Sequence, residues 1–143
     1  MLKKYIASGF ILLCFFASCK KNSDSTTPDP AVPEPLTVSN ISLDNRSSAG
    51  PVYNTSLTPS INIRLSAPVE QSSVGSAVKI TDAGGNAVAL TSSFQNKDSV
   101  LIIQPSTPLK NITRYSINIS TSLQSAAGSK LAGPVALTFI TRI

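Results

Sequence analysis

The sequence contains no histidine and no tryptophan among its 143 residues. Without histidine the chain cannot form a Ser-His-Asp or Cys-His catalytic set, and it lacks the commonest general base and zinc ligand. Both cysteines, Cys14 and Cys19, lie close to the N-terminus. The long remainder therefore has neither a disulfide nor a thiolate metal site. These absences exclude the most frequent arrangements of hydrolytic and zinc chemistry.

Acidic residues are also few, with seven Asp and Glu in the whole chain. Those of the C-terminal part, Asp44, Glu70, Asp82 and Asp98, are widely separated. A glycosidase needs two carboxyl groups that face each other about 5 to 10 Å apart, and this spacing indicates no such pair. Asp82 and Asn86 could hold a calcium ion through a turn, but the same residues are typical of a plain hairpin. We therefore expect a non-catalytic protein without a metal or other cofactor.

Twelve Lys and Arg residues give the chain a formal net charge of +5. They are dispersed along the sequence and not gathered in one run, so they mostly keep the protein soluble. Nucleic-acid binding would favour a basic stripe with interleaved aromatic side chains. Residues 36–143 contain only the aromatics Tyr53, Phe94, Tyr115 and Phe139. We expect no nucleic-acid partner.

No hydrophobic run in the sequence is long enough to cross a membrane. Two lysines near the start precede an apolar stretch at residues 5–16, whereas a transmembrane helix needs roughly 20 apolar residues. A short apolar stretch after a basic start, followed by small residues such as Ala17 and Ser18, is typical of an export signal. Residues 1–18 are therefore predicted to be a signal peptide that leaves the mature protein.

The predicted signal ends in Phe16, Ala17 and Ser18 before Cys19, and these four residues resemble the lipobox of bacterial lipoproteins. The resemblance implies that Cys19 is lipidated, carries several acyl chains and so anchors the chain stably. The alternative is an ordinary secretory signal cut near Ser18, which would leave Cys19 as an unpaired thiol. Lys20 stands where an inner-membrane retention signal has Asp. We expect a lipid-anchored protein of the cell envelope in the outer membrane, on either its periplasmic or its surface face.

Residues 19–35 are rich in proline, serine and threonine and have too few apolar residues to bury a core. Proline favours extended polyproline II backbone, at about 3.1 Å per residue. This segment, with the lipidated Cys19 at its start, is predicted to be a disordered tether. It would hold the rest of the chain away from the lipid headgroups.

Short alternating runs of apolar and polar residues recur over residues 36–143, and such alternation is typical of half-buried β-strands. About seven strands are predicted, at residues 41–43, 61–65, 78–80, 88–90, 100–103, 115–119 and 137–139. No stretch has the periodicity of a helix. Prolines and glycines fall between the runs, where they predict turns.

Seven short strands in a domain of this length favour an antiparallel β-sandwich of Ig-like size. The turn residues 82–86 predict a hairpin connection, because glycine and asparagine adopt positive φ at little cost. Tyr115 opens a strand and is predicted to turn its hydroxyl back onto the preceding connection, as a tyrosine corner. The predicted core side chains are Ile61, Ile63, Leu65, Val78, Ile80, Leu101, Ile103, Leu109, Tyr115, Ile117, Ile119, Leu137 and Phe139.

Three motifs of this domain resemble those of the bacterial Ig-like domain of the S-layer protein (SbsA) type. They are SINIRLSAPVE from residue 60, SVLIIQPSTPLKNITRYSINI from residue 99 and GSKLAGPVALTFIT from residue 128. Their order and spacing follow the family's pattern of a strand ending in Ser-x-Pro-Val, a Pro-Leu segment leading to Thr-x-Tyr, and a Gly-Pro segment before a terminal Thr-Phe-x-Thr strand. The resemblance covers residues 36–142 and implies an Ig-like sandwich.

An anchor, a tether and an Ig-like domain without a catalytic set predict a spacer or presentation module of the bacterial envelope. Its expected partners are the membrane, through the anchor, and polysaccharide or other envelope proteins. A second interpretation is a carbohydrate-binding module, with Tyr53 and Phe94 as ligand contacts. A third makes the chain the N-terminal accessory part of a larger secreted hydrolase, because domains that resemble this one commonly precede such enzymes.

Overall fold

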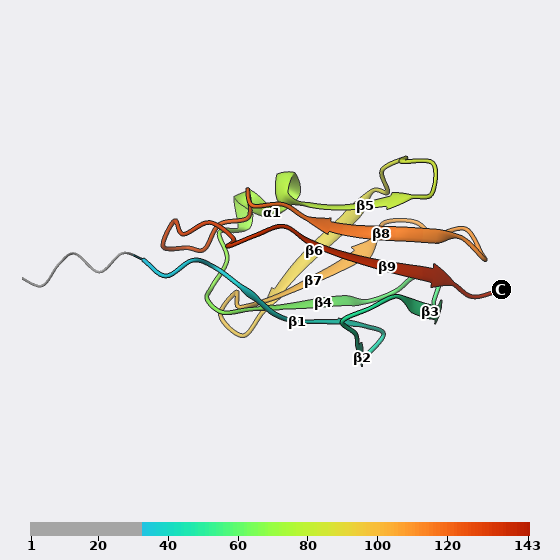
Figure 1. Ribbon diagram of the computed structural model, residues 1–143, viewed down its shortest axis with the longest axis horizontal. Helices are drawn as coiled ribbons and strands as arrows, with labels where there is room; N and C mark the ends of the chain where they lie inside the picture. Colours follow the sequence, from blue (N-terminus) through green and yellow to red (C-terminus); the bar gives the residue numbers. More distant parts are fainter. Residues whose placement is uncertain (1–32) are drawn as a thin grey trace, which may run out of the picture. The chain divides into compact units, whose positions relative to one another are not determined.

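The alternating runs of the sequence form two packed β-sheets in the computed structural model, which describes residues 33–143 (Figure 1). The first sheet has the strand order β2-β1-β4-β7-β6, and the second has the order β3-β9-β8-β5. The elements are β1 Val38–Leu43, β2 Arg46–Ser47, β3 Val52–Thr55, β4 Ile61–Leu65, α1 Gln71–Ala77, β5 Val78–Asp82, β6 Leu90–Gln95, β7 Val100–Pro105, β8 Arg114–Ile119 and β9 Val135–Thr141. The predicted all-β sandwich is confirmed, with nine strands in place of about seven. The predicted signal peptide, Cys19 and most of the predicted tether lie outside the described residues.

The short strands β2 and β3 have no counterpart in the sequence prediction. β3 pairs in parallel with β9, whereas the other paired strands among residues 33–143 are antiparallel. After β2 the chain leaves the first sheet and enters the second sheet as β3. There β3 runs in the same direction as β9. The pairing shifts register between Val52 and Thr55, next to Asn54 with its φ of 57°. β3 has only two paired positions and an irregular backbone. Its sequence therefore does not alternate between apolar and polar residues, and no strand could be predicted from it.

The turn at residues 82–86 forms as predicted, but the strand predicted at residues 88–90 does not: a single bridge joins Thr81 to Ala87, and β6 begins only at Leu90. The Asp82 N–H donates to the Asn86 carbonyl at 3.0 Å, and Gly85 has a φ of 80°, which glycine adopts readily. Beyond the turn, the Val88 N–H donates to the Ile80 carbonyl at 2.9 Å. The chain then crosses over, because β5 belongs to the second sheet and β6 to the first. The turn was predictable, but the crossover that follows it was not.

Helix α1 was not predicted, and its sequence explains why. It has seven residues, which is about two turns and too short to show a helical period. Glu70 caps the N-terminus, since its carboxylate accepts from the Ser72 N–H at 3.4 Å. Only Val74 and Ala77 of the helix are buried. Among residues 33–143 no helix is both long and apolar enough to span a membrane.

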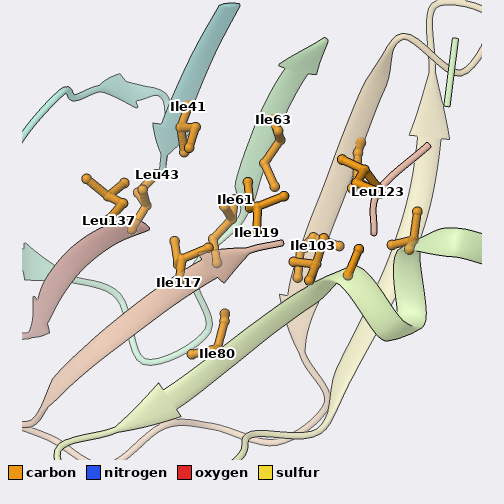
Figure 2. Close-up of a cluster of buried hydrophobic side chains, with 14 of the residues drawn as sticks. Ile41, Leu43, Ile61, Ile63, Ile80, Ile103, Ile117, Ile119, Leu123 and Leu137 are labelled. Carbon is orange, nitrogen blue, oxygen red and sulfur yellow. The ribbon is translucent and has the colours of Figure 1, made fainter. Parts of the chain in front are cut away.

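The core lies between the two sheets, and all of the predicted core side chains are buried. Figure 2 shows isoleucines and leucines from both sheets pointing toward one another, among them Ile61 and Ile63 of β4 and Ile117 and Ile119 of β8. Other core residues stand alone in loops and short elements, where no period marks them: Leu36, Val69, Leu123 and Leu131 are examples. The sequence pattern therefore identified the centre of the core but not its ends.

The predicted tyrosine corner is confirmed. The Lys110 N–H donates to the Tyr115 hydroxyl oxygen at 3.0 Å, which fixes the connection before β8 to the start of that strand. The Tyr115 ring is buried and stacks on Phe139 of β9, with ring centroids 5.5 Å apart. The Tyr115 side chain therefore accepts a hydrogen bond from the loop and also packs in the core.

The domain has two poles. At the first pole the chain enters the sandwich, where the Leu36 N–H donates to the Lys130 carbonyl at 3.0 Å. At the second pole β9 ends, and the Arg142 N–H donates to the Thr55 carbonyl at 2.8 Å. Figure 1 shows the first residues of the domain and its C-terminal residue at opposite ends of the sandwich. We call these ends the entry pole and the far pole.

Candidate functional site

The outward side chains of β5, β8 and β9 form one continuous face of the second sheet. Successive residues of a strand point to opposite faces, so Ser116 points outward between the buried Tyr115 and Ile117. The registers align Arg114 with Ile140, Ser116 with Thr138 and Thr81, and Asn118 with Ala136 and Lys79. We call this surface the second-sheet face and describe it by three rows of residues across the strands.

Tyr53 of β3 extends the first of these rows. Val52 pairs with Phe139 and Thr55 with Thr141, and the register shifts between these two pairs, so the exposed Tyr53 lies at the edge of the sheet along the β9 segment that contains Ile140. The Tyr53 side chain is 63% exposed. Arg114 pairs with Ile140, and we group Tyr53 with these two residues as the Tyr53 row.

The edge that carries Tyr53 is fastened to the other sheet. The guanidinium of Arg46, in β2 of the first sheet, donates to the carbonyls of Tyr53 at 3.1 Å and Asn54 at 3.3 Å. Because both bonds go to backbone, they hold the strand and leave the Tyr53 ring uncommitted.

The other two rows are polar. Thr138, Ser116 and Thr81 form a hydroxyl row across the middle of the face. Ala136, Asn118 and Lys79 form the last row, which we call the Lys79 row. A shallow groove of about 320 Å³ lies along the Lys79 row and is bordered by Ser76 and Ser120.

The face carries positive charge, from Arg114 and Lys79, which are both exposed. Asp82 ends β5, but its carboxylate is occupied within its own turn. Its Oδ1 accepts from the N–H groups of Gly84 and Asn86, each at 2.9 Å, and the Asn86 side-chain amide donates to both carboxylate oxygens. The side-chain amide of Asn86, followed by its backbone N–H, holds the pKa of Asp82 below its usual value.

The turn that Asp82 and Asn86 predict is present in the structure. The carboxylate oxygens already accept hydrogen bonds from the turn that they stabilise. Within residues 33–143 no group of three or more His, Cys, Asp or Glu side chains could hold a metal ion.

Phe94, the second predicted ligand contact, lies elsewhere. It belongs to β6 and pairs with the buried Leu101, and its half-buried ring packs against the core. β6 is the last strand of the first sheet, whereas β3 is fastened to β2 at the opposite edge. The structure therefore does not bring Phe94 and Tyr53 together. Cys19, the predicted lipidation site, is outside the described residues.

Arg114, Ile140 and the hydroxyl row were not singled out from the sequence. The alternation of residues 115–119 does mark Ser116 and Asn118 as outward-facing. Their assembly with Tyr53 depends on the parallel pairing of β3 with β9, which no local pattern indicates.

The comparisons with known proteins agree with this fold. The family model described as bacterial Ig-like domain (Big_5) matches residues 33–141. A crystal structure of the S-layer protein SbsC is similar at 12% identity with a TM-score of 0.51, and the match covers 76% of this chain and 14% of that chain. Escherichia coli alpha-2-macroglobulin is similar at 12% identity and a TM-score of 0.56, over 76% of this chain and 6% of that one.

A fragment of the same macroglobulin, spanning domains MG0-NIE-MG1, matches at 12% identity with a TM-score of 0.55, over 76% of this chain and 32% of the fragment. The chain thus spans less than a third of the length of each of these proteins, and at this identity the likeness concerns the fold. No curated protein is detectably similar to the sequence. Because the family model matches most of its length, the chain belongs to the bacterial Ig-like domain family.

Proposed function

We propose that this protein is a non-catalytic, lipid-anchored module of the bacterial cell envelope that spaces and presents a binding surface away from the membrane. The observation that carries the proposal is the placement of the two poles. The chain enters the domain at one pole and β9 ends at the other (Figure 1). An anchor on the entry side would therefore direct the far pole away from the membrane.

The predicted tether fits this role. Its proline-rich half, residues 28–35, would span about 25 Å as polyproline II, at about 3.1 Å per residue. Lipidation of Cys19 with several acyl chains would hold such a module stably at a membrane surface. The predicted outer-membrane location follows from Lys20 after the cysteine and belongs to the same proposal.

The carboxylates of the domain support a non-catalytic role, because each of them is used in the structure. Asp44 accepts from the N–H groups of Ser56 and Ser60, Glu70 from that of Ser72, Asp82 from those of Gly84 and Asn86, and Asp98 from the side-chain amide of Gln71. Carboxylates placed in turns and at a helix cap stabilise the fold. The bacterial Ig-like family is likewise typically a non-catalytic module.

The anchor is tested by comparing the Cys19→Ala and Cys14→Ala variants in the host cell. Cys19→Ala should shift the protein from the membrane pellet to the soluble fraction, because it removes the acylated thiol. Cys14→Ala changes a cysteine inside the predicted signal and should leave the protein in the pellet. Labelled palmitate should be incorporated into the wild type and Cys14→Ala but not into Cys19→Ala. Absence of label from the wild type would overturn the proposed anchor.

A further inference from the structure

We propose that the second-sheet face binds an acidic polysaccharide, with Tyr53 as the surface on which a sugar ring stacks and with Arg114 and Lys79 as contacts for its carboxylates. This goes beyond the proposed spacer role, because it names what the module would hold. The proposal does not depend on the lipid anchor.

Tyr53 has the properties of a ligand contact and not of a core residue. Tyr53 is 63% exposed on the edge strand β3, and the neighbouring strand β9 carries the half-buried Ile140. A tyrosine combines a flat apolar ring with a polar hydroxyl, which is why it is enriched where one partner presents both kinds of surface. The pyranose ring of a sugar presents an apolar face and a rim of hydroxyls. Tyr53 complements both.

The hydroxyl row lies next to this platform. Thr138, Ser116 and Thr81 stand side by side on neighbouring strands. Each hydroxyl can donate one hydrogen bond and accept others, and the amide of Asn118 in the adjacent row can do both as well. Groups that donate and accept suit sugar hydroxyls, which do the same.

The positive charges of the second-sheet face favour an acidic polymer as its partner. Arg114 and Lys79 belong to the two outer rows, which lie four residues apart along β8, about 14 Å at the usual rise per residue. The hydroxyl row separates these rows. The nearest carboxylate along β5, that of Asp82, is committed to its turn. A chain of sugars with repeated carboxylates could reach both cations, and the Arg114 guanidinium can bind a carboxylate through two hydrogen bonds.

Other partners fit the face less well. A nucleic acid would need several aromatic side chains among the cations, and this face has Tyr53 alone. The buried centre of a protein interface is enriched in apolar and aromatic side chains, whereas the middle row of this face consists of hydroxyl groups. The uniform polarity of that row favours the polysaccharide.

The first sheet provides an internal control on the opposite side of the sandwich. Arg64 of β4 is exposed there in a polar groove of about 230 Å³ that Asn40, Asn62 and Gln95 also line, and no aromatic side chain lines it. Like Arg114, Arg64 is an outward arginine in an inner strand of its sheet. Replacing either one removes the same charge, so only a site on the second-sheet face distinguishes them.

The test is native affinity electrophoresis of the full chain in mild detergent, through gels that contain alginate, a polymer of uronic acids. Alginate should retard the wild type, and dextran, a neutral polymer, should retard it much less. Tyr53→Ala and Arg114→Ala should each weaken the alginate effect about tenfold, as expected for central contacts. Tyr53→Phe keeps the stacking ring and loses only the hydroxyl, so it should weaken the effect less than Tyr53→Ala does, and Arg64→Ala should change it less than twofold. Unchanged thermal midpoints would show that the variants are folded.

Three results would overturn the proposal. The first is no retardation by alginate, including the case in which anionic lipid vesicles bind the protein instead. The second is an equal effect of Arg64→Ala and Arg114→Ala, which would indicate attraction to net charge. The third is retention of alginate binding in a folded Tyr53→Ala variant. None of these results would affect the Cys19 experiments, so the two proposals fail separately.

Discussion

The inner and outer sides of the second sheet are made by alternate residues of the same strands, yet they differ in almost every physical respect. In β8, Tyr115 and Ile117 are buried in the core, while their neighbours Ser116 and Asn118 face outward. The side chains of the inner side stabilise the fold because folding removes their apolar surface from water. The outer side contributes little to stability and is therefore free to carry recognition. Alternate residues of one strand therefore stabilise the core on one side and are available for the proposed binding on the other.

The far pole shows the same separation within β9. Phe139 is completely buried, and Ile140, the next residue, lies in the Tyr53 row on the outer face. Adjacent substitutions can therefore test the two sides independently.

Phe139→Ala should have the largest effect on stability. It removes a fully buried ring that stacks on Tyr115, and such truncations cost about 3–5 kcal/mol through lost burial and the cavity left behind. The free energy of unfolding is measured by urea denaturation. Ile140→Ala, the matched control, should cost about 1 kcal/mol or less, since that residue is half-buried on the outer side. Equal losses would contradict the assignment of the two sides.

Tyr115→Phe should have a smaller effect, about 1 kcal/mol. The ring stays in the core, but the partly buried Lys110 N–H loses its acceptor. Tyr53→Phe removes the same hydroxyl from an exposed ring and should change the free energy of unfolding by less than about 0.5 kcal/mol. A similar change in both variants would show that the tyrosine corner adds nothing to stability.

The smallest expected effect on stability is at Asp82, the last residue of β5, where the alternation of inward and outward side chains ends. Asn86→Ala should raise the pKa of Asp82 toward its usual 3.8, because the side-chain amide of Asn86 is the main cause of the lowered value. A carboxyl whose pKa is lower in the folded state adds stability that is fully present above the unfolded pKa and is lost as the pH falls through the folded value. The wild-type turn should therefore weaken only below about pH 3.8.

NMR titration of the Asp82 carboxyl carbon measures this pKa directly. Lys110→Ala, which removes the weakest of the causes that lower the pKa, is the control and should change it much less. A pKa unchanged by Asn86→Ala would mean that the side-chain amide of Asn86 is not the main cause of the lowered value.

Much of the fold was predictable because the signals were local. The alternation of residues 61–65 and 115–119 predicted β4 and β8, and the residues that the pattern placed inward are buried. The turn at 82–86 and the corner of Tyr115 depend on residues close in sequence. Helix α1 and strand β3 are too short or too irregular to leave such a signal.

The candidate site was predictable only in part. An exposed aromatic at Tyr53 was a reasonable expectation, since its neighbours do not form an apolar run. Phe94 looked equivalent in sequence, but its pairing with Leu101 turns it toward the core. Whether an isolated aromatic faces inward depends on the strand beside it, and its own neighbours in sequence do not contain that information.

By itself, the sequence determined that residues 36–143 form strands with one apolar side, and it carries the cysteine signal on which the proposed anchor depends. These properties arise from single residues and short periods, which act before any distant contact forms. Only the tertiary structure decided which strands share a sheet, that β3 joins β9 in parallel, and that Tyr53 and Arg114 belong to the same sheet. The reason is that strand pairing joins backbone groups far apart in sequence, and its register is chosen by the packing of the whole core.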